Sequence, residues 1–172
     1  MLTKIDLCSF ALLKLGESSI QSLDDDSVSA QLSRTLFYPV VETLIALHPW
    51  RFAKKKINLN KTTDGDFLIP SEVIRILKSS GEVVGDRIIS QTDSVSVTAL
   101  IRVPVEKFPS YFASLVATKL AMEFCIPLSG DQNVFQMLVA LYESELRAAK
   151  FIDSTVSVNS DIAEFSLISS RF

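Results

Sequence analysis

Hydrophobic side chains recur at helical spacing near both ends of this chain, and between those regions they alternate with polar ones, as in strands. The first helix is predicted from about Lys4 to Leu15, with Thr3 as its N-cap and Gly16 just beyond its end. Its apolar face consists of Ile5, Cys8, Leu12 and Leu15. A loop over residues 17–25 follows.

A longer amphipathic helix is predicted next, capped by Asp25 or Asp26 and kinked at Pro39. Its apolar stripe consists of Val28, Leu32, Leu36, Val40, Leu44 and Leu47. His48 precedes Pro49, and a residue before proline disfavours the helical backbone. The helix is therefore expected to end there.

The segment after that helix combines His48, Pro49, Trp50 and Phe52 with three lysines. It holds the only histidine and the only tryptophan of the chain. The arrangement predicts a helix end fixed by a buried indole, with a basic strand leading away from it. We interpret His48, Pro49, Trp50 and Phe52 as a structural motif.

The middle of the chain has the alternation of antiparallel strands. Strands are predicted over Lys54–Asn60, Val73–Lys78, Val83–Ser90 and Ser94–Val103. In the last of these, Val95, Val97, Ala99, Ile101 and Val103 share one face. Gly81 and Gly85 mark a tight hairpin. The sequence predicts one small sheet with a solvent-exposed face.

Two helices are predicted after the sheet and should pack as an antiparallel hairpin. The third runs from about Pro109 to Ile126 and ends at Pro127; it is apolar nearly all round, so we expect it to be central or covered by a partner. Its thin polar stripe consists of Ser110, Ser114 and Thr118. The fourth runs from about Asp131 to Ile152. Its apolar stripe comprises Phe135, Leu138, Val139, Tyr142, Leu146 and Ala149, and Glu143, Glu145, Arg147 and Lys150 are expected to face outward.

These elements predict a mainly α fold, a bundle of about four helices with a small antiparallel β insertion over residues 54–104. Residues 1–152 form the domain, and residues 153–172 an extended C-terminal arm. The arm is rich in serine but keeps scattered apolar side chains. It either becomes ordered on a partner or docks as a strand on its own domain. Its candidate contact residues are Val156, Val158, Ile162, Phe165, Leu167, Ile168, Arg171 and Phe172.

Composition narrows the class of protein. The 172 residues are 48% hydrophobic and 22% charged, which is typical of a globular domain, and the net charge of −3 argues against a dedicated nucleic-acid binder. Cys8 and Cys125 occupy apolar positions of predicted helices, which favours two free thiols in a reducing compartment. The alternative is a disulfide bond between them. Lys119 and Glu123 interrupt the longest apolar segment, which disfavours a membrane span. With no signal peptide evident, we expect synthesis in the cytoplasm.

The residues that carry chemistry form no catalytic, metal-binding or cofactor-binding pattern. His48 lacks partner ligands, and Asp24, Asp25 and Asp26 lack the spacing of a calcium loop. We therefore expect a protein that is not an enzyme and holds no cofactor. Arg51, Lys54, Lys55 and Lys56 could face the phosphates of DNA. The alternative is a charged edge strand that resists aggregation.

An ordered series of short motifs resembles the head-to-tail joining proteins of tailed bacteriophages, prophages and gene transfer agents, of the tail tubular protein A type. The matching residues near the N-terminus are Ala11, Leu12, Leu15, Gly16, Ile20, Ser22, Leu23, Asp24, Asp26 or Ser27, Tyr38, His48, Pro49, Trp50, Phe52 and Ala53. Further matches are Phe67–Ile76, then Phe112, Ala117, Leu120 and Ala121, then Pro127–Asp131 and Tyr142–Ala149. Glu42 departs from the pattern, because family members often carry an arginine there.

This resemblance implies a structural virion protein located at the head–tail interface and assembled in the bacterial host cytoplasm. Such proteins form a homo-oligomeric ring, usually of twelve subunits, that binds the portal protein and the tail proteins. DNA passes through the lumen without specific binding, and no membrane is involved. The alternative function is a small DNA-binding or packaging accessory protein that uses the basic segment Arg51–Lys56.

Overall fold

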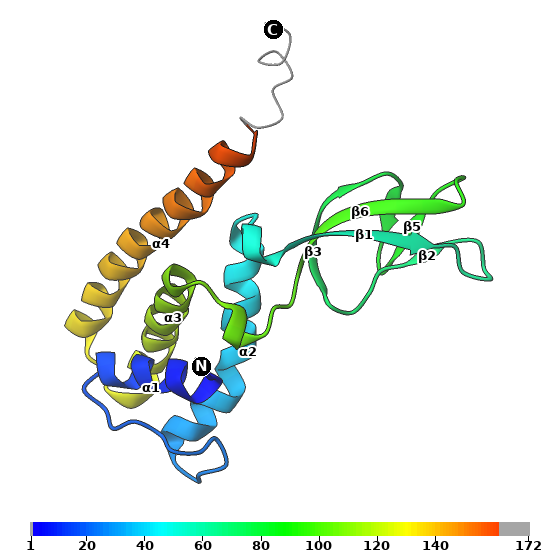
Figure 1. Ribbon diagram of the computed structural model, residues 1–172. Helices are drawn as coiled ribbons and strands as arrows, with labels where there is room; N and C mark the ends of the chain where they lie inside the picture. Colours follow the sequence, from blue (N-terminus) through cyan, green and yellow to red (C-terminus); the bar gives the residue numbers. More distant parts are fainter. Residues whose placement is uncertain (1, 162–172) are drawn as a thin grey trace, which may run out of the picture.

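The computed structural model describes residues 2–161, with side chains as far as Thr155. Within that range lie four α-helices and six strands. The helices are α1 (Lys4–Lys14), α2 (Val28–Leu47), α3 (Ser110–Leu128) and α4 (Gln132–Asp161). Figure 1 shows the helices gathered as a bundle, with the strands projecting to one side of it. The predicted fold class, mainly α with a small antiparallel β insertion, is confirmed.

Helix α1 follows the sequence prediction closely. Thr3 caps it in a reciprocal capping box with Asp6, whose pKa is lowered by the hydrogen bonds from the Thr3 side chain and backbone. At the other end Gly16 has a φ of 78°, a left-handed conformation that suits glycine after a helix.

The predicted cap of α2 was wrong by one or two residues. Ser27 has an extended backbone, and its hydroxyl accepts from the backbone N–H of Ala30 at 3.2 Å. Asp25 instead accepts from the N–H of Ser22 at 3.4 Å, within the preceding loop. The helix ends as predicted, with His48 as its extended C-cap.

The predicted apolar stripe of α2 was also partly wrong, because Val28 is 58% exposed and Leu47 is 49% exposed. Residues four apart on a helix are rotated by about 40°, so a long series with that spacing spirals away from one face. The face that the helix buries comprises Ala30, Ser33, Phe37, Val40, Val41, Leu44 and Ile45.

Helix α3 is the central helix of the bundle and packs against α1, α2 and α4. By length and hydropathy alone it could cross a membrane, but this burial within the bundle accounts for its apolar character. Pro127 lies inside its last turn rather than ending it. The chain stays helical to Leu128, and the N–H of Ser129 donates to the carbonyl of Cys125 at 3.0 Å.

Helix α4 continues to Asp161, so the first nine residues of the predicted arm are helical. The hydroxyls of Ser154 and Thr155 donate to carbonyls of the preceding turn, at 2.7 and 2.9 Å, and so remain within the helix. Glu145 does not face outward as predicted. Its carboxylate accepts from the hydroxyls of Ser114 and Thr118 on α3, at 3.0 and 2.6 Å.

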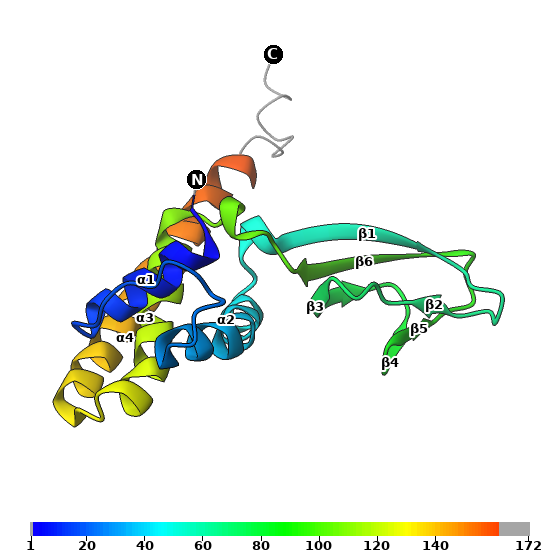
Figure 2. The ribbon, with the colours of Figure 1, turned by 90° about the horizontal axis from the view of Figure 1, so that it is seen from below.

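The strands form two three-stranded antiparallel sheets rather than the single predicted sheet. Sheet A has the order β1-β6-β3, with bounds Lys54–Asn60, Ser94–Ile101 and Val73–Ser79. Sheet B has the order β2-β5-β4, with bounds Phe67–Leu68, Arg87–Ile89 and Glu82–Val84. The predicted strand Val83–Ser90 is divided into β4 and β5, because Gly85 turns the chain with a φ of 59°. Figure 2 shows β1 and β6 running together away from the helices.

The molecule has two hydrophobic cores, one in the helical bundle and one between the sheets, in the part that we call the β-module (residues 54–101). Strand β6 contributes to both. Val95, Val97 and Ala99 belong to the core of the β-module, whereas Leu100 is buried in the core of the bundle. The predicted apolar face of β6 holds to the end of the strand, where Ile101 opposes Val73, a residue that packs against the core of the β-module. Val103 lies beyond the strand and packs against the bundle.

Candidate functional site

The segment His48–Pro49–Trp50 forms a buried anchor at the point where the bundle meets the β-module. The Trp50 side chain has no exposed area, and its Nε1–H donates to the carbonyl of Leu44 at 2.7 Å. The rings of His48 and Phe112 lie edge-on to the indole, with centroids 4.7 and 5.3 Å away. The prediction of a helix end fixed by a buried indole is confirmed.

Asp153 of α4 completes this anchor and is only 3% exposed. Its carboxylate accepts from the backbone N–H of Arg51, with both oxygens at 3.2 Å, and from the Tyr111 hydroxyl at 2.8 Å. His48 Nε2 lies 3.4 Å from the same carboxylate. One side chain thus ties α4 to the end of α2 and the start of α3.

The chemistry of this cluster is that of a structural anchor. Burial raises the pKa of the Tyr111 hydroxyl, and its hydrogen bond to the Asp153 carboxylate raises it further. Tyr111 therefore stays protonated and donates to Asp153. A tyrosine held neutral in this way is a poor base, and the geometry favours holding helices together over proton transfer.

Asp153 was missed by the sequence reasoning, which placed it at the start of the arm. A signal was present, because Asp153 continues the apolar stripe of α4 by the spacing Leu146, Ala149, Asp153. A lone acid on a buried stripe needs partners, and the hydrogen-bond donors came from segments far away in the sequence.

The structure divides the predicted basic group into three parts. Lys54 and Lys56 lie exposed on one face of the edge strand β1. Lys55 points to the other face and pairs with Glu72 at 3.2 Å. The side chain of Arg51 is exposed in the short 3-10 turn Arg51–Ala53, while its backbone N–H binds Asp153.

Two further cations on β3 join Lys54 and Lys56, and sequence reasoning missed them. Arg75 and Lys78 oppose Leu100 and Thr98 of β6, which in turn oppose Lys54 and Lys56 of β1. Residues directly opposite in a ladder project from the same face of a sheet. The alternation of polar residues in β3 was visible in the sequence, but the strand order that places β3 beside β6 was not.

Glu42, which stands where the resembling family often has an arginine, has a partner within the chain. Its carboxylate accepts from Arg102 Nε at 2.6 Å, and Arg102 also donates to the carbonyl of Ser71 at 2.8 Å. Glu42 therefore helps to join α2 to the base of the β-module.

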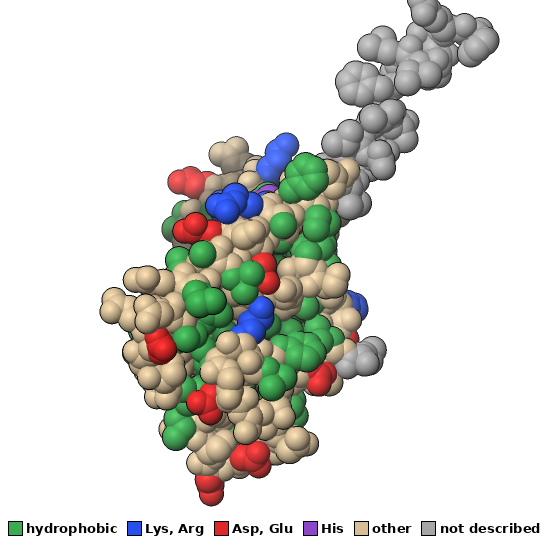
Figure 3. Space-filling model, turned by 90° about the vertical axis from the view of Figure 1, so that its left-hand side faces the viewer, with side chains coloured by type: hydrophobic (Ala, Val, Ile, Leu, Met, Phe, Trp, Pro, Cys, Tyr) green, Lys and Arg blue, Asp and Glu red, His purple; other side chains and the backbone are tan. Residues whose placement is uncertain are grey.

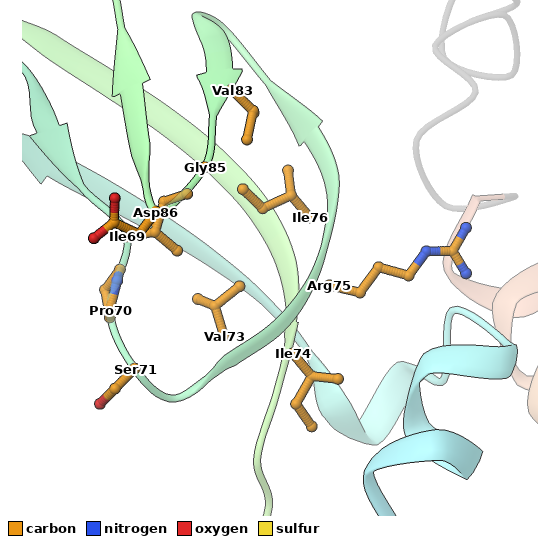
Figure 4. A pocket seen from close by; sticks show the side chains of 10 residues that line it. All are labelled: Ile69, Pro70, Ser71, Val73, Ile74, Arg75, Ile76, Val83, Gly85 and Asp86. Atoms are coloured by element: carbon orange, nitrogen blue, oxygen red, sulfur yellow. The ribbon is translucent and has the colours of Figure 1, made fainter.

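A hollow of about 410 Å³ opens between the two sheets, at the end of the β-module nearer to the helices (Figure 4). Its lining is mainly apolar, with Ile69, Val73 and Ile76 around the opening. The two charged side chains of the lining do not converge. Arg75 extends toward the helices, where it donates to the carbonyl of Ala46 at 2.7 Å, and Asp86 lies at the opposite edge. This arrangement offers no pair of groups for acid–base chemistry.

The described residues contain no group of three or more His, Cys, Asp or Glu side chains placed to hold a metal ion. Cys8 and Cys125 are both buried and free, and burial raises the pKa of the Cys8 thiol. Such thiols behave as small apolar side chains.

The predicted contact residues of the arm fall largely outside the described residues. Val156 and Val158 are part of helix α4. Ile162, Phe165, Leu167, Ile168, Arg171 and Phe172 lie outside the described range. Comparison with known proteins adds no assignment, since no family model matches the chain and no curated protein matches it significantly.

Proposed function

We propose that this chain is a structural protein of a tailed bacteriophage or prophage, forming a ring that joins the portal vertex of the capsid to the tail and lets DNA pass. The observation that carries the proposal is the number of large apolar side chains left in water on the bundle. On α1, Phe10 and Leu13 are 49% and 58% exposed, and on α4, Met137 and Phe151 are 73% and 70% exposed. We call these four residues the apolar rim.

Figure 3 views the molecule from the helical side, where hydrophobic side chains are spread over the surface among acidic and basic ones. Beside Phe10 lies a hollow of about 540 Å³, lined by residues of α1 and α3 that include Ala113 and Ala117. Phenylalanine and methionine are enriched at the centres of protein interfaces. A neighbouring copy that packed on Phe10 and this hollow would remove apolar side chains from water.

The division into bundle and β-module also suits a ring. Every subunit of a closed ring uses two different surfaces, one for each neighbour. The bundle and the projecting β-module provide two such surfaces with different chemistry (Figure 1). With α4 fixed through Asp153, the chain leaves the bundle at a defined place, from which residues 162–172 engage a neighbouring subunit or the portal.

The test is the mass of the purified full-length protein, alone and mixed with its portal protein, by native mass spectrometry. We expect a portal-dependent ring. The double variant Met137→Ser/Phe151→Ser should prevent ring formation, whereas Val28→Ser/Leu47→Ser, which removes exposed apolar side chains of α2 outside the apolar rim, should leave it intact. A monomer that ignores the portal at high concentration would overturn the proposal.

The role of the tail is tested by ending the chain after Asp161 rather than after Asp153. Asp153 belongs to the buried anchor, so a cut there would damage the bundle and mimic a loss of binding. A chain of residues 1–161 should keep its circular dichroism spectrum and lose its affinity for the portal. Unchanged portal binding would contradict the assignment of the tail.

A further inference from the structure

One face of sheet A concentrates positive charge on a protein whose net charge is −3. In the register of the sheet, Lys56 opposes Thr98 and Thr98 opposes Lys78, so the three side chains form a row across β1, β6 and β3. The adjacent row consists of Lys54, Leu100 and Arg75. We call this surface the lysine–hydroxyl face.

Hydroxyl groups fill the space between the lysines. A hollow of about 300 Å³ on this face is lined by Lys56, Lys78, Ser79, Ser80, Ser96 and Thr98. The Ser80 oxygen accepts from the N–H of Ser96 at 3.1 Å. A hydroxyl that accepts a hydrogen bond still has its own hydrogen to donate, so Ser80 can donate to a ligand oxygen, as can Thr98 in the row between the two lysines.

The charges on this face are not neutralised by the protein. Among the described residues no carboxylate lies within 4.0 Å of the ammonium groups of Lys54, Lys56 or Lys78, whereas Lys55 on the other face is paired with Glu72. Arg75 donates to the carbonyl of Ala46, a bond that leaves its positive charge in place. Cations and hydroxyl donors without a carboxylate make a surface for oxyanions.

The spacing of the cations favours an extended polyanion over a small one. Lys56 and Lys78 are separated by one intervening strand, which puts their backbones about 10 Å apart, and successive rows along a strand are about 7 Å apart. A small anion on this open surface would reach one or two of these groups. Duplex DNA carries one charge per about 1.7 Å of its axis and can therefore contact several cations at once.

We propose that the lysine–hydroxyl face binds the phosphate backbone of double-stranded DNA without regard to sequence. The residues that β1 and β6 present there are lysine, asparagine, serine, threonine and one buried leucine, with no aromatic ring on which an unpaired base could stack. The contact is with phosphates rather than with base edges. This inference does not depend on the ring, since the free protein has the complete face.

The proposal assigns different residues from those expected from the sequence. Lys54 and Lys56 belong to the face, and Lys78 and Arg75 join them from β3. Lys55 is excluded because it projects from the other side of the sheet and is paired. Arg51 is excluded because it lies before the strand, in the 3-10 turn.

The experiment measures the affinity of the full-length protein for a fluorescent 30-base-pair duplex by anisotropy, at several salt concentrations. For about three phosphate contacts, raising the salt fourfold should weaken binding by about 40-fold. The variant Lys56→Glu/Lys78→Glu should weaken binding at least tenfold. The variant Lys107→Glu/Arg147→Glu makes the same change in net charge on exposed positions outside sheet A and should bind like the parent protein.

A milder variant separates a loss of contacts from a loss of folding. Lys56→Gln/Lys78→Gln should keep the circular dichroism spectrum of the parent protein while reducing the slope of log affinity against log salt by about 2. A second duplex of unrelated sequence should bind with the same affinity.

Three results would overturn the proposal. The first is no binding of duplex at low salt, and the second is equal weakening by the Lys107/Arg147 control. The third is displacement of the duplex by inorganic phosphate more strongly than by sodium chloride at equal ionic strength, which would indicate a small-anion site. A protein that binds duplex DNA but never assembles with the portal would contradict the proposed ring and would still support DNA binding by the lysine–hydroxyl face.

Discussion

The helical bundle and the β-module of this molecule have hydrophobic cores of very different size. The bundle contains Trp50, Phe37, Phe112 and Phe124, all completely buried, around a continuous core. The core of the β-module consists of six buried side chains, with Phe67 as its only aromatic one. The free energy of folding should therefore come mainly from the bundle. The lysine–hydroxyl face of sheet A can carry charges and hydroxyl groups because, apart from Leu100, its side chains belong to neither core.

The largest predicted loss of stability comes from replacing Trp50 in the core of the bundle. Trp50→Ala should lower the free energy of unfolding by about 3–5 kcal/mol, because it removes a fully buried indole from contact with several rings. The measurement is urea unfolding followed by far-ultraviolet circular dichroism.

Trp50→Phe is the matched control. It keeps most of the apolar volume but loses the hydrogen bond to the carbonyl of Leu44, so the loss should be smaller, about 1–3 kcal/mol. If Trp50→Ala left the urea midpoint unchanged, the bundle would not depend on this anchor.

The independence of the β-module is tested at Phe67. Phe67→Ala should lower the free energy of unfolding by about 3 kcal/mol, mainly within the β-module, because the core of the module and the core of the bundle have no residue in common. Hydrogen exchange read by mass spectrometry should show faster exchange in β5 and β6 and unchanged exchange in α3. Leu115→Ala, at a fully buried position of α3, should have the opposite distribution. Uniformly faster exchange in both variants would mean one cooperative unit.

The contribution of Asp153 should be smaller than that of Trp50. Asp153→Asn keeps the size of the side chain but replaces one carboxylate oxygen, an acceptor, with an amide donor, at a cost of about 1–3 kcal/mol. Glu143→Gln makes the same chemical change at an exposed position of α4 and should alter stability by less than about 0.5 kcal/mol. Equal urea midpoints for the two variants would show that the buried network adds nothing.

The smallest effect is expected from the ionisation of Tyr111. Its pKa is raised in the folded state, so its contribution to stability is complete below the ordinary tyrosine pKa of about 10 and is lost as the pH rises above that value. Urea midpoints measured from pH 8 to pH 11 should fall above pH 10. They should fall less steeply for Tyr111→Phe, which has no proton to lose, and parallel curves would contradict the assignment.

The two regions were also unequally predictable from sequence. Strand β1 was predicted at its observed bounds, and α1 to within one residue, because their signals are local: a cap, a glycine, an alternation. The fold class followed from those signals. The division of residues 83–90 into two strands, and of the strands into two sheets, depended on pairing between distant segments, which one sequence does not reveal.

The same limit applied to the sites. The buried indole was predictable because Trp50 follows a proline that ends a helix. The acceptor at Asp153 is 102 residues from its donor at Arg51, and the serine-rich composition around Asp153 suggested an arm rather than a helix. Likewise, Lys56 and Lys78 share a face of sheet A because both oppose Thr98 of β6, and this strand order is not visible in the sequence.

The two strands that join the β-module to the bundle act as a lever with two rigid attachments. Strand β1 leaves directly from the 3-10 turn behind Trp50, and β6 returns with Leu100 embedded among the helices. A sideways load on the tip of the module therefore becomes a torque on two buried points of its base, Trp50 and Leu100. The module should tilt only when the packing around Trp50 and Leu100 gives way, and smaller loads should be borne elastically by the paired strands.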